Sequence, residues 1–183
     1  MKISPTHIND VLIIEPQVFG DERGYFFESF KESELTNYLG YKINFCQDNE
    51  SKSSFGVLRG LHYQLPPFAQ TKLVRVIQGK VLDVAVDIRK DSPTFGQHVA
   101  VELTDENKKQ LFIPRGFAHG FVVLSETTIF SYKVDNPYAP QHEDGIIWND
   151  GGLNIDWILN ASEVQLSGKD QSLGELKNLE IMF

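Results

Sequence analysis

The chain has 183 residues, of which 41% are hydrophobic and 23% charged, a composition that predicts one globular domain over residues 1–183. Its formal net charge of −8, without any run of Lys or Arg, argues against a nucleic-acid-binding protein. No apolar stretch is long enough to cross a membrane, no secretory signal is visible, and the one cysteine cannot form an internal disulfide, so we expect a cytoplasmic protein without membrane partners.

The sequence predicts one short helix, and after it come short apolar runs that turn-forming residues separate. Residues 31–39 predict that helix, because two leucines spaced four residues apart share one helical face. Turn-forming pairs such as Ser92-Pro93 separate the runs that come later. Six runs predict β-strands, at residues 73–77, 80–87, 99–103, 110–114, 120–124 and 128–132. One or two further short helices are expected between residues 161 and 179.

The spacing of these strands indicates the fold class. Strands that recur about every ten residues are typical of a sandwich or barrel. Parallel strands need crossover connections of a dozen or more residues, and the central runs leave no room for them. We therefore predict an all-β jelly-roll barrel with a few short helices, a fold that closes most sheet edges.

Two histidine-containing segments resemble the motifs of the cupin superfamily. Gly56 is followed six residues later by His62, as at the start of the first cupin motif. A Pro-x-Gly-x-x-His turn leads from Pro114 to His119 and into an apolar strand, as in the second motif. Alternatively, both histidines are satisfied polar residues beneath the mouth of the barrel.

The metal ligands of a typical cupin are incomplete in this sequence. Gln64 stands where the first motif has its second histidine, and Lys72 stands where it has its glutamate. An ammonium repels a divalent cation and cannot ligate one. The sequence therefore predicts a cupin-shaped pocket that binds no metal and needs no cofactor.

Without a metal, the remaining groups suit proton transfer next to a carbonyl. An imidazole titrates near neutral pH and can act as a general base. A fixed ammonium can stabilise an oxyanion as its charge develops, and a phenol can deliver a proton from the other side. Abstraction of an α-proton followed by reprotonation on the opposite face is the chemistry of an epimerase or isomerase.

Over residues 5–172 the sequence resembles the dTDP-4-dehydrorhamnose 3,5-epimerase family. The segments that carry this resemblance are residues 19–28, 47–51, 56–64, 83–89, 92–96, 114–121, 145–150 and 166–170. The resemblance implies a cupin-like jelly roll that forms a homodimer. It also implies inversion of dTDP-4-dehydro-6-deoxy-D-glucose at C3 and C5, in dTDP-L-rhamnose biosynthesis. Both carbons lie next to the C4 ketone, so one ketone acidifies both.

The resemblance also assigns catalytic roles. His62, in Leu-His-Tyr-Gln, is implied to accept the proton, and Asp170 to orient its ring and stabilise its protonated form. Tyr132 is implied to be the proton donor. Lys72 is implied to hold the enolate formed at O4.

The nucleotide is implied to bind through a larger set of residues. That set is Arg23, Glu28, Gln47, Asp48, Asn49, Arg59, His119, Glu143 and Lys169, with Tyr138 stacked on the base. Guanidinium groups suit phosphate oxygens, so Arg23 and Arg59 are expected at the diphosphate, with Gln47 and either Asn49 or Glu28 at the thymine edge. The family uses its N-terminal strands across the dimer, so Phe19, Arg23, Phe26 and Glu28 are expected in the partner's pocket.

Three other functions remain open on the sequence alone. A relative that inverts only C3 or only C5 would need nearly the same residues. A metal-dependent cupin enzyme is disfavoured by Lys72, and a sugar-nucleotide-binding module without catalysis is disfavoured by the combination of His62, Lys72 and Tyr132. Gly151-Gly152 departs from the family pattern, and the chain beyond Gly174 offers no match.

Overall fold

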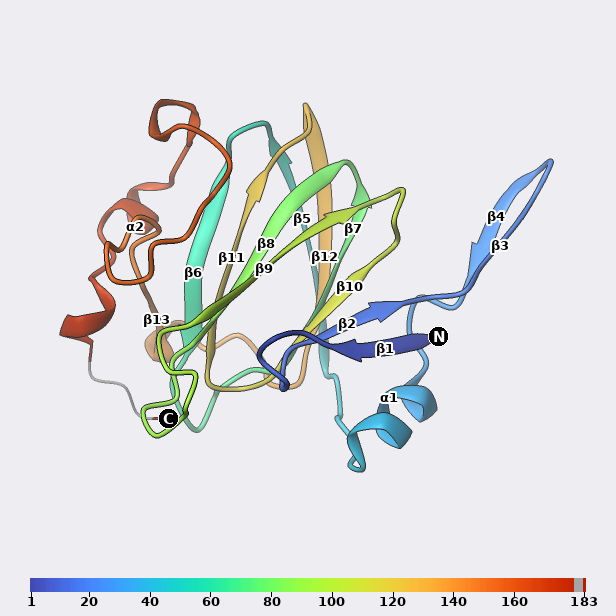
Figure 1. Ribbon diagram of the computed structural model, residues 1–183, viewed down its shortest axis with the longest axis horizontal. Helices are drawn as coiled ribbons and strands as arrows, with labels where there is room; N and C mark the ends of the chain where they lie inside the picture. Colours follow the sequence, from blue (N-terminus) through green and yellow to red (C-terminus); the bar gives the residue numbers. More distant parts are fainter. Residues whose placement is uncertain (180–182) are drawn as a thin grey trace.

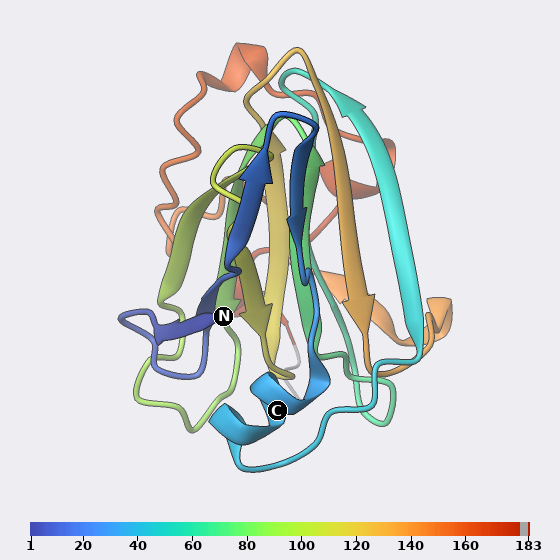
Figure 2. The same ribbon diagram turned by 90° about the vertical axis from the view of Figure 1, so that its right-hand side faces the viewer.

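In the computed structural model, which describes residues 1–179 and 183, two antiparallel sheets face each other and enclose the main core (Figure 1). The first sheet has the strand order β1-β2-β10-β7-β12-β5. Its strands are β1 (Lys2–Pro5), β2 (Leu12–Glu15), β10 (Gln110–Ile113), β7 (Lys72–Gln78), β12 (Thr127–Val134) and β5 (Gln47–Ser54). Figure 2 looks onto this sheet, with β5 (cyan) at its edge beside β12 (orange).

The second sheet has the strand order β13-β6-β11-β8-β9. Its strands are β13 (Glu143–Gly145), β6 (Leu58–Gln64), β11 (Phe117–Val123), β8 (Lys80–Asp87) and β9 (His98–Thr104). The helical segments are α1 (Glu32–Leu39), α2 (Gly168–Gln171) and three 3₁₀ turns at Pro140–His142, Ala161–Glu163 and Leu176–Asn178. None of the described helices is long and apolar enough to span a membrane.

Burial on both faces of the second sheet explains why its strands are almost continuously apolar. Its inner face packs Ala85 and Phe121 against Val74 and Phe130 of the first sheet. Its outer face is covered by the C-terminal segment, which includes Trp157. A strand buried on both faces needs apolar residues at consecutive positions, whereas a half-exposed strand alternates. The few polar residues in β8 and β11 are therefore conspicuous.

A sharp turn at Gly79 connects β7 to β8. This residue has φ +87°, a conformation that favours glycine. A Cβ atom there would lie 2.3 Å from the carbonyl oxygen of Thr127. The sharp turn lets two long strands follow each other directly, so that one belongs to each sheet.

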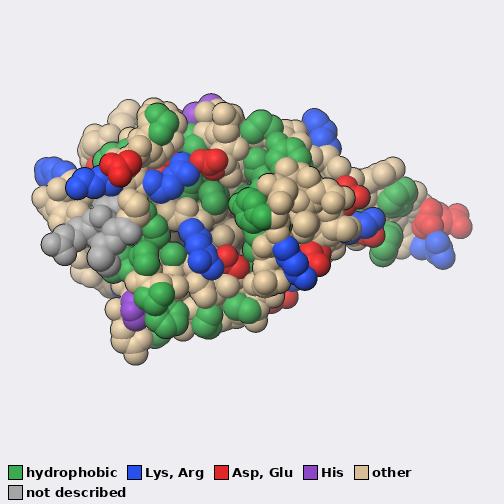
Figure 3. Space-filling view, turned by 90° about the horizontal axis from the view of Figure 1, so that it is seen from below, with side chains coloured by type: hydrophobic (Ala, Val, Ile, Leu, Met, Phe, Trp, Pro, Cys, Tyr) green, Lys and Arg blue, Asp and Glu red, His purple; other side chains and the backbone are tan. Residues whose placement is uncertain are grey.

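A two-stranded hairpin, β3 (Val18–Asp21) and β4 (Gly24–Phe27), projects away from the two sheets (Figure 1). Seen from below, it stands clear of the body of the protein, with charged side chains at its tip and apolar ones behind them (Figure 3). Phe19 and Phe26 are 55% and 67% exposed. Isolated two-stranded hairpins are marginally stable in water, so exposed phenylalanines on such an arm indicate a contact surface.

The predicted all-β jelly roll is confirmed. The six predicted strands correspond to β7 to β12, and the helix predicted over residues 31–39 corresponds to α1. The expected helical turns after residue 161 also form. The single domain over residues 1–183 stays a prediction, and residues 180–182 of it lie outside the described part of the chain.

Candidate active site

A cavity of about 310 Å³ opens between the two sheets. The strands β6 and β11 of the second sheet supply one wall, the strands β5, β7 and β12 of the first sheet supply the other, and α2 lies at the side. The lining residues are Glu50, Ser51, Arg59, His62, Lys72, His119, Phe121, Phe130, Tyr132, Ser167, Lys169 and Asp170. All four residues expected to be catalytic therefore line one cavity.

His62 and Asp170 form a hydrogen-bonded pair. His62 Nε2 lies 2.6 Å from Asp170 Oδ1. Because a carboxylate only accepts, Nε2 carries the proton, and Nδ1 of the neutral ring keeps its lone pair. Among the described residues, Nδ1 has no hydrogen-bond partner. The imidazole is thus oriented by one nitrogen and free to act as a base through the other.

Asp170 is held by the start of α2. Ser167 caps this short helix by accepting from the backbone N–H of Asp170, and its hydroxyl donates to Asp170 Oδ2 at 2.7 Å. Burial pushes the pKa of Asp170 upward, but hydrogen bonds from His62 and Ser167 outweigh it and leave the pKa below its usual value. Asp170 therefore stays ionised beside His62 and can stabilise the imidazolium.

Lys72 lies on the inner face of β7, next to His62. Its Nζ is 3.4 Å from the backbone carbonyl oxygen of His62. Burial lowers the pKa of Lys72 to about 8, although the charges of Asp83 and Glu143 act to raise it. At neutral pH the side chain is still mainly an ammonium, held in a low-dielectric cavity where its field on a developing oxyanion is strong.

Tyr132 faces His62 from the other sheet. It belongs to β12, whose neighbour β7 carries Lys72, whereas His62 belongs to β6. Burial, with a contribution from Glu143, raises the pKa of Tyr132, so the phenol keeps its proton. A base on one wall and a protonated acid on the other are the arrangement that inversion of a carbon between them requires.

Two residues that replace cupin metal ligands in the sequence have other contacts or other chemistry in the structure. Gln64, at the position of the second motif histidine, uses its side-chain amide to bind the backbone at Phe68, Pro137 and Ala139. Lys72 occupies the position of the acidic ligand. Among the residues that the structure describes, no group of three or more His, Cys, Asp or Glu is placed to hold a metal ion. That the protein works without a metal stays a prediction.

A polar cluster at the mouth of the cavity contains half of the residues expected at the nucleotide. Gln47 donates to Asn49 at 2.7 Å and accepts from the backbone N–H of Tyr138 at 3.2 Å. The Glu143 carboxylate accepts hydrogen bonds from the Tyr138 hydroxyl and the Lys169 ammonium. Lys169 also lines the cavity, so this cluster is continuous with it.

Arg59 provides a cation on the same wall as His62. Its Nε donates to the hydroxyl of Ser53 at 3.1 Å, and in the described structure it has no carboxylate partner. A guanidinium without a neutralising acid, at the lip of a cavity, is well suited to a diphosphate.

Five residues expected at the site lie elsewhere in this chain. Asp48 points to the outer face of the first sheet and pairs with Lys133 at 2.9 Å, because alternate residues of β5 face opposite ways. The structure therefore does not bring Asp48 to the cavity. The others, Phe19, Arg23, Phe26 and Glu28, lie on or beside the projecting hairpin, away from the cavity of their own chain.

Sequence reasoning missed several residues that shape the cavity. Asp83 is fully buried and bonds His119 Nε2 through Oδ2 at 2.9 Å. Ser167 holds Asp170, and the stacked rings of Phe121 and Phe130, with centroids 4.1 Å apart, line the cavity. The one available signal for Asp83 in the sequence was its position as an acidic residue inside an apolar run.

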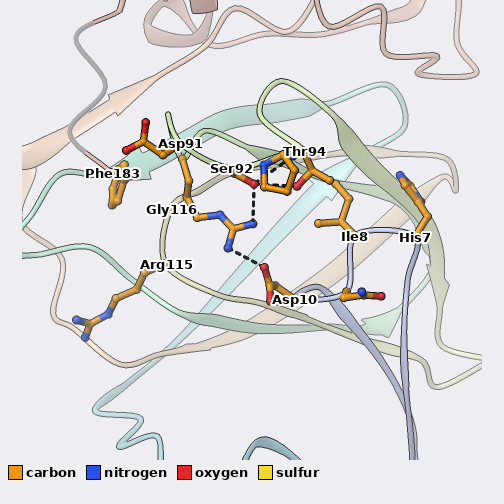
Figure 4. A pocket seen from close by; sticks show the side chains of 12 residues that line it. His7, Ile8, Asp10, Asp91, Ser92, Thr94, Arg115, Gly116 and Phe183 are labelled. Atoms are coloured by element: carbon orange, nitrogen blue, oxygen red, sulfur yellow. Dashed lines mark hydrogen bonds and ion pairs between the residues drawn. The ribbon is translucent and has the colours of Figure 1, made fainter.

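A larger cavity of about 640 Å³ lies beside Arg89 and Phe183 (Figure 4) and shares no lining residue with the first cavity. The Arg89 guanidinium is already bonded to Asp10 and Asp87, each at 2.7 Å. This cavity therefore offers no free charge from Arg89 to a phosphate and contains none of the proposed catalytic residues.

Comparisons with known proteins agree with this geometry. The family model described as dTDP-4-dehydrorhamnose 3,5-epimerase matches residues 5–178. Proteins of that name from Shigella flexneri and Escherichia coli are 59% and 53% identical. The Shigella alignment covers 86% of this chain and 87% of the relative, and the Escherichia alignment covers 98% and 96%.

A solved structure is also closely similar. The dTDP-6-deoxy-D-glucose-3,5-epimerase from Legionella pneumophila, crystallised with dTDP-4-keto-L-rhamnose, superposes with a TM-score of 0.94 at 51% identity. The match covers 98% of this chain and 94% of that protein. The chain therefore belongs to the dTDP-4-dehydrorhamnose 3,5-epimerase family.

Proposed function

We propose that this chain inverts C3 and C5 of dTDP-4-dehydro-6-deoxy-D-glucose through proton transfers between His62 and Tyr132. The enzyme is an isomerase of dTDP-rhamnose biosynthesis. One observation carries the mechanism: His62 and Tyr132 line one cavity from opposite sheets, together with Lys72. Among the rival functions, a metal-dependent reaction would need ligands in place of Lys72 and Gln64.

Each inversion begins with removal of a proton next to the ketone. His62 takes the proton from C3 or C5, and the electrons of that C–H bond form an enolate whose negative charge rests on O4. The Lys72 ammonium stabilises this oxyanion, and Asp170 stabilises the imidazolium. Because the reaction moves only protons, it needs no oxidant or reductant.

Reprotonation then comes from the other wall. Tyr132 donates its phenolic proton to the opposite face of the same carbon, and the C4 carbonyl reforms. The phenolate regains a proton from solvent, and the imidazolium loses one to solvent, so the site is restored. A small movement of the sugar ring then presents the second carbon to the same groups.

The nucleotide half is proposed to bind at the mouth of the cavity. Arg59 would bind the diphosphate, and Gln47 and Asn49 the polar edge of thymine, while Tyr138 would stack on the base. The hydrogen bonds that join Gln47, Asn49 and Tyr138 support a preorganised thymine site. Preorganisation reduces the entropy lost on binding.

Exchange in heavy water tests the reaction itself. The protein is incubated with dTDP-4-dehydro-6-deoxy-D-glucose in deuterated solvent, and the product is examined by NMR. Deuterium at both C3 and C5 is expected. Deuterium at one carbon would identify a single-centre epimerase, and the absence of turnover would identify a binding module.

A Tyr132→Phe variant separates proton removal from inversion. It keeps the ring and loses the acid, so we expect continued α-proton exchange with solvent and at least about a hundredfold less inverted product. The ratio of exchange to inversion is measured by NMR against wild type. An unchanged ratio would mean that another group donates the proton.

We also propose a cytoplasmic homodimer in which each β3–β4 hairpin completes the partner's site. The exposed Phe19 and Phe26 support this assignment, as does the absence of Arg23 and Glu28 from their own cavity. On this proposal, Arg23 binds the diphosphate held in the partner subunit.

Complementation tests the exchanged hairpin. Arg23→Ala and His62→Ala variants should each be weakly active, and after unfolding and refolding together they should recover roughly a quarter of the wild-type rate. Half of the dimers are then mixed, and one of their two sites has both an intact His62 and an intact arm. Recovery should be absent if each chain uses its own Arg23.

A further inference from the structure

Asp83 is a buried acid that the proton transfers described above do not use. It lies in β8 between Leu82 and Val84, which face the outer apolar cluster, so that Asp83 itself faces the inside of the barrel. Its exposure is 0%. One oxygen bonds His119, but Oδ1 has no hydrogen-bond partner among the described residues. Unsatisfied buried carboxylate oxygens are costly and call for an explanation.

His119 links this carboxylate to the cavity. Its ring lines the cavity, and its Nε2 lies 2.9 Å from Asp83 Oδ2. Burial lowers the pKa of His119, against the opposing influence of Asp83, so the ring is neutral. Since an ionised carboxylate only accepts, Asp83 places the proton of that ring on Nε2 and fixes its orientation.

Lys72 is the nearby group whose buried ammonium form a negative charge would stabilise. Within the described residues, no carboxylate lies within 4 Å of its ammonium, and its one hydrogen bond is to the carbonyl oxygen of His62. Several charged or titratable side chains line the cavity around it or act on its charge, from β5, β6, β8, β11, β12, β13 and α2. They are Glu50, Arg59, His62, Asp83, His119, Tyr132, Glu143, Lys169 and Asp170.

The carboxylates in that set differ in how much of their charge is already neutralised. Asp170 is bonded to His62 and Ser167, and Glu143 is bonded to Lys169 and Tyr138. Asp83 bonds only the neutral ring of His119, through Oδ2, and its Oδ1 has no hydrogen-bond partner among the described residues. Glu50, the fourth carboxylate, is exposed, so solvent screens its charge. Among the other three, Asp83 has the least neutralised charge, and it acts on Lys72 through an interior of low dielectric.

We propose that Asp83 is a positioning residue of the epimerisation, which fixes the ring of His119 and keeps Lys72 in its ammonium form. This inference rests on the proposed function, because it concerns the charge that stabilises the enolate. Asp83 does not touch the reacting atoms. Its effect reaches them through Lys72, which must be protonated when the negative charge forms on O4.

The pH dependence of turnover tests the proposal. Activity that needs the Lys72 ammonium is present at low pH and is lost as the pH rises through the pKa of Lys72. Asp83→Asn keeps the shape and removes the charge, so the alkaline limb of kcat should move to lower pH by about one unit, with little change in KM. In Lys72→Arg, which cannot lose its proton, the limb should be absent at any residual rate.

Asp87→Asn is the matched control. Asp87 lies on the same strand, is equally buried, and bonds Arg89, Ser92 and Thr94 away from the cavity. We expect it to lower the melting temperature and leave the alkaline limb in place. Asp83→Ser removes the same charge with a smaller side chain and should move the limb like Asp83→Asn.

An unmoved limb in a folded Asp83 variant would overturn the proposal, and so would an equal shift in Asp87→Asn. If neither Asp83 variant folds while Asp87→Asn does, Asp83 is a structural residue and the proposal is wrong. Wild-type turnover of dTDP-4-dehydro-6-deoxy-D-glucose is measured first. Its absence would contradict the proposed function, whereas its presence with an unmoved limb would contradict only the role of Asp83.

Discussion

A His62→Ala variant is expected to lose turnover by about 10²–10⁴-fold while it binds dTDP as tightly as the wild type. The imidazole lies in the sugar cavity beside Lys72 and Asp170, whereas the proposed thymine site is built from Gln47, Asn49 and Tyr138. Removing it therefore removes a base and leaves the nucleotide contacts in place. Steady-state kinetics gives the turnover, and calorimetric titration with dTDP gives the affinity.

His7→Ala is the control for that substitution. His7 is exposed, its ring contacts the backbone carbonyl of His98 at 3.0 Å, and it does not line the cavity that contains the proposed catalytic residues. It should keep the wild-type rate. Equal losses of dTDP affinity and turnover in His62→Ala would show that His62 is a binding residue, and the proposed base would have to be another group.

A Lys72→Met variant should lose nearly all turnover and become more stable. Methionine fills a similar volume, so packing is kept while the charge on the enolate is left without its counterion. The pKa of the buried ammonium is about 8 against an ordinary 10.5. A shift of that size corresponds to about 1 to 3 kcal/mol gained in the free energy of unfolding when the charge is removed.

The pH dependence of that stability gain has a definite sign. Because the pKa of Lys72 is lower in the folded state, the unfolded chain binds more protons between about pH 8 and pH 10.5. Wild-type stability therefore rises across that window through this group, and Lys72→Met should lack the rise. Denaturant unfolding at several pH values measures it.

Lys52→Met, on the exposed face of β5, should change neither property. If Lys72→Met proved less stable than wild type while Lys52→Met did not, the ammonium would be a net stabilising group. Its burial would then need a direct partner that the described residues do not supply.

The strands were predictable wherever apolar side chains recur in a compact run, as in β7, β8 and β11. The strand β5 was not, because its sequence Gln-Asp-Asn-Glu-Ser-Lys-Ser-Ser contains no apolar residue. It forms at the edge of a sheet through eight residue pairs with β12, so its existence depends on a partner distant in sequence. The β3–β4 hairpin was equally hard to predict as a packed element, since most of its apolar residues are exposed.

The composition of the site was predictable from motifs, and its geometry was not. His62 and Asp170 are 108 positions apart, and only the fold brings them to 2.6 Å. Asp48 was expected with its neighbours Gln47 and Asn49, but the two-residue period of a strand turns it to the opposite face. Asp83 was obscured for a related reason, because β8 is buried on both faces and shows no alternation that would reveal which way the acid points.

The two groups proposed to transfer protons, His62 and Tyr132, belong to different sheets, so the gap between them is set by the thickness of the hydrophobic core. Facing sheets pack about 10 Å apart, which leaves room for one sugar ring between their side chains. The stacked Phe121 and Phe130, one from each sheet, act as a spacer at that point. If the proposed function is right, the stereochemical outcome depends on the distance between the two sheets, because that distance determines whether a returning proton can reach the far side of the hexose.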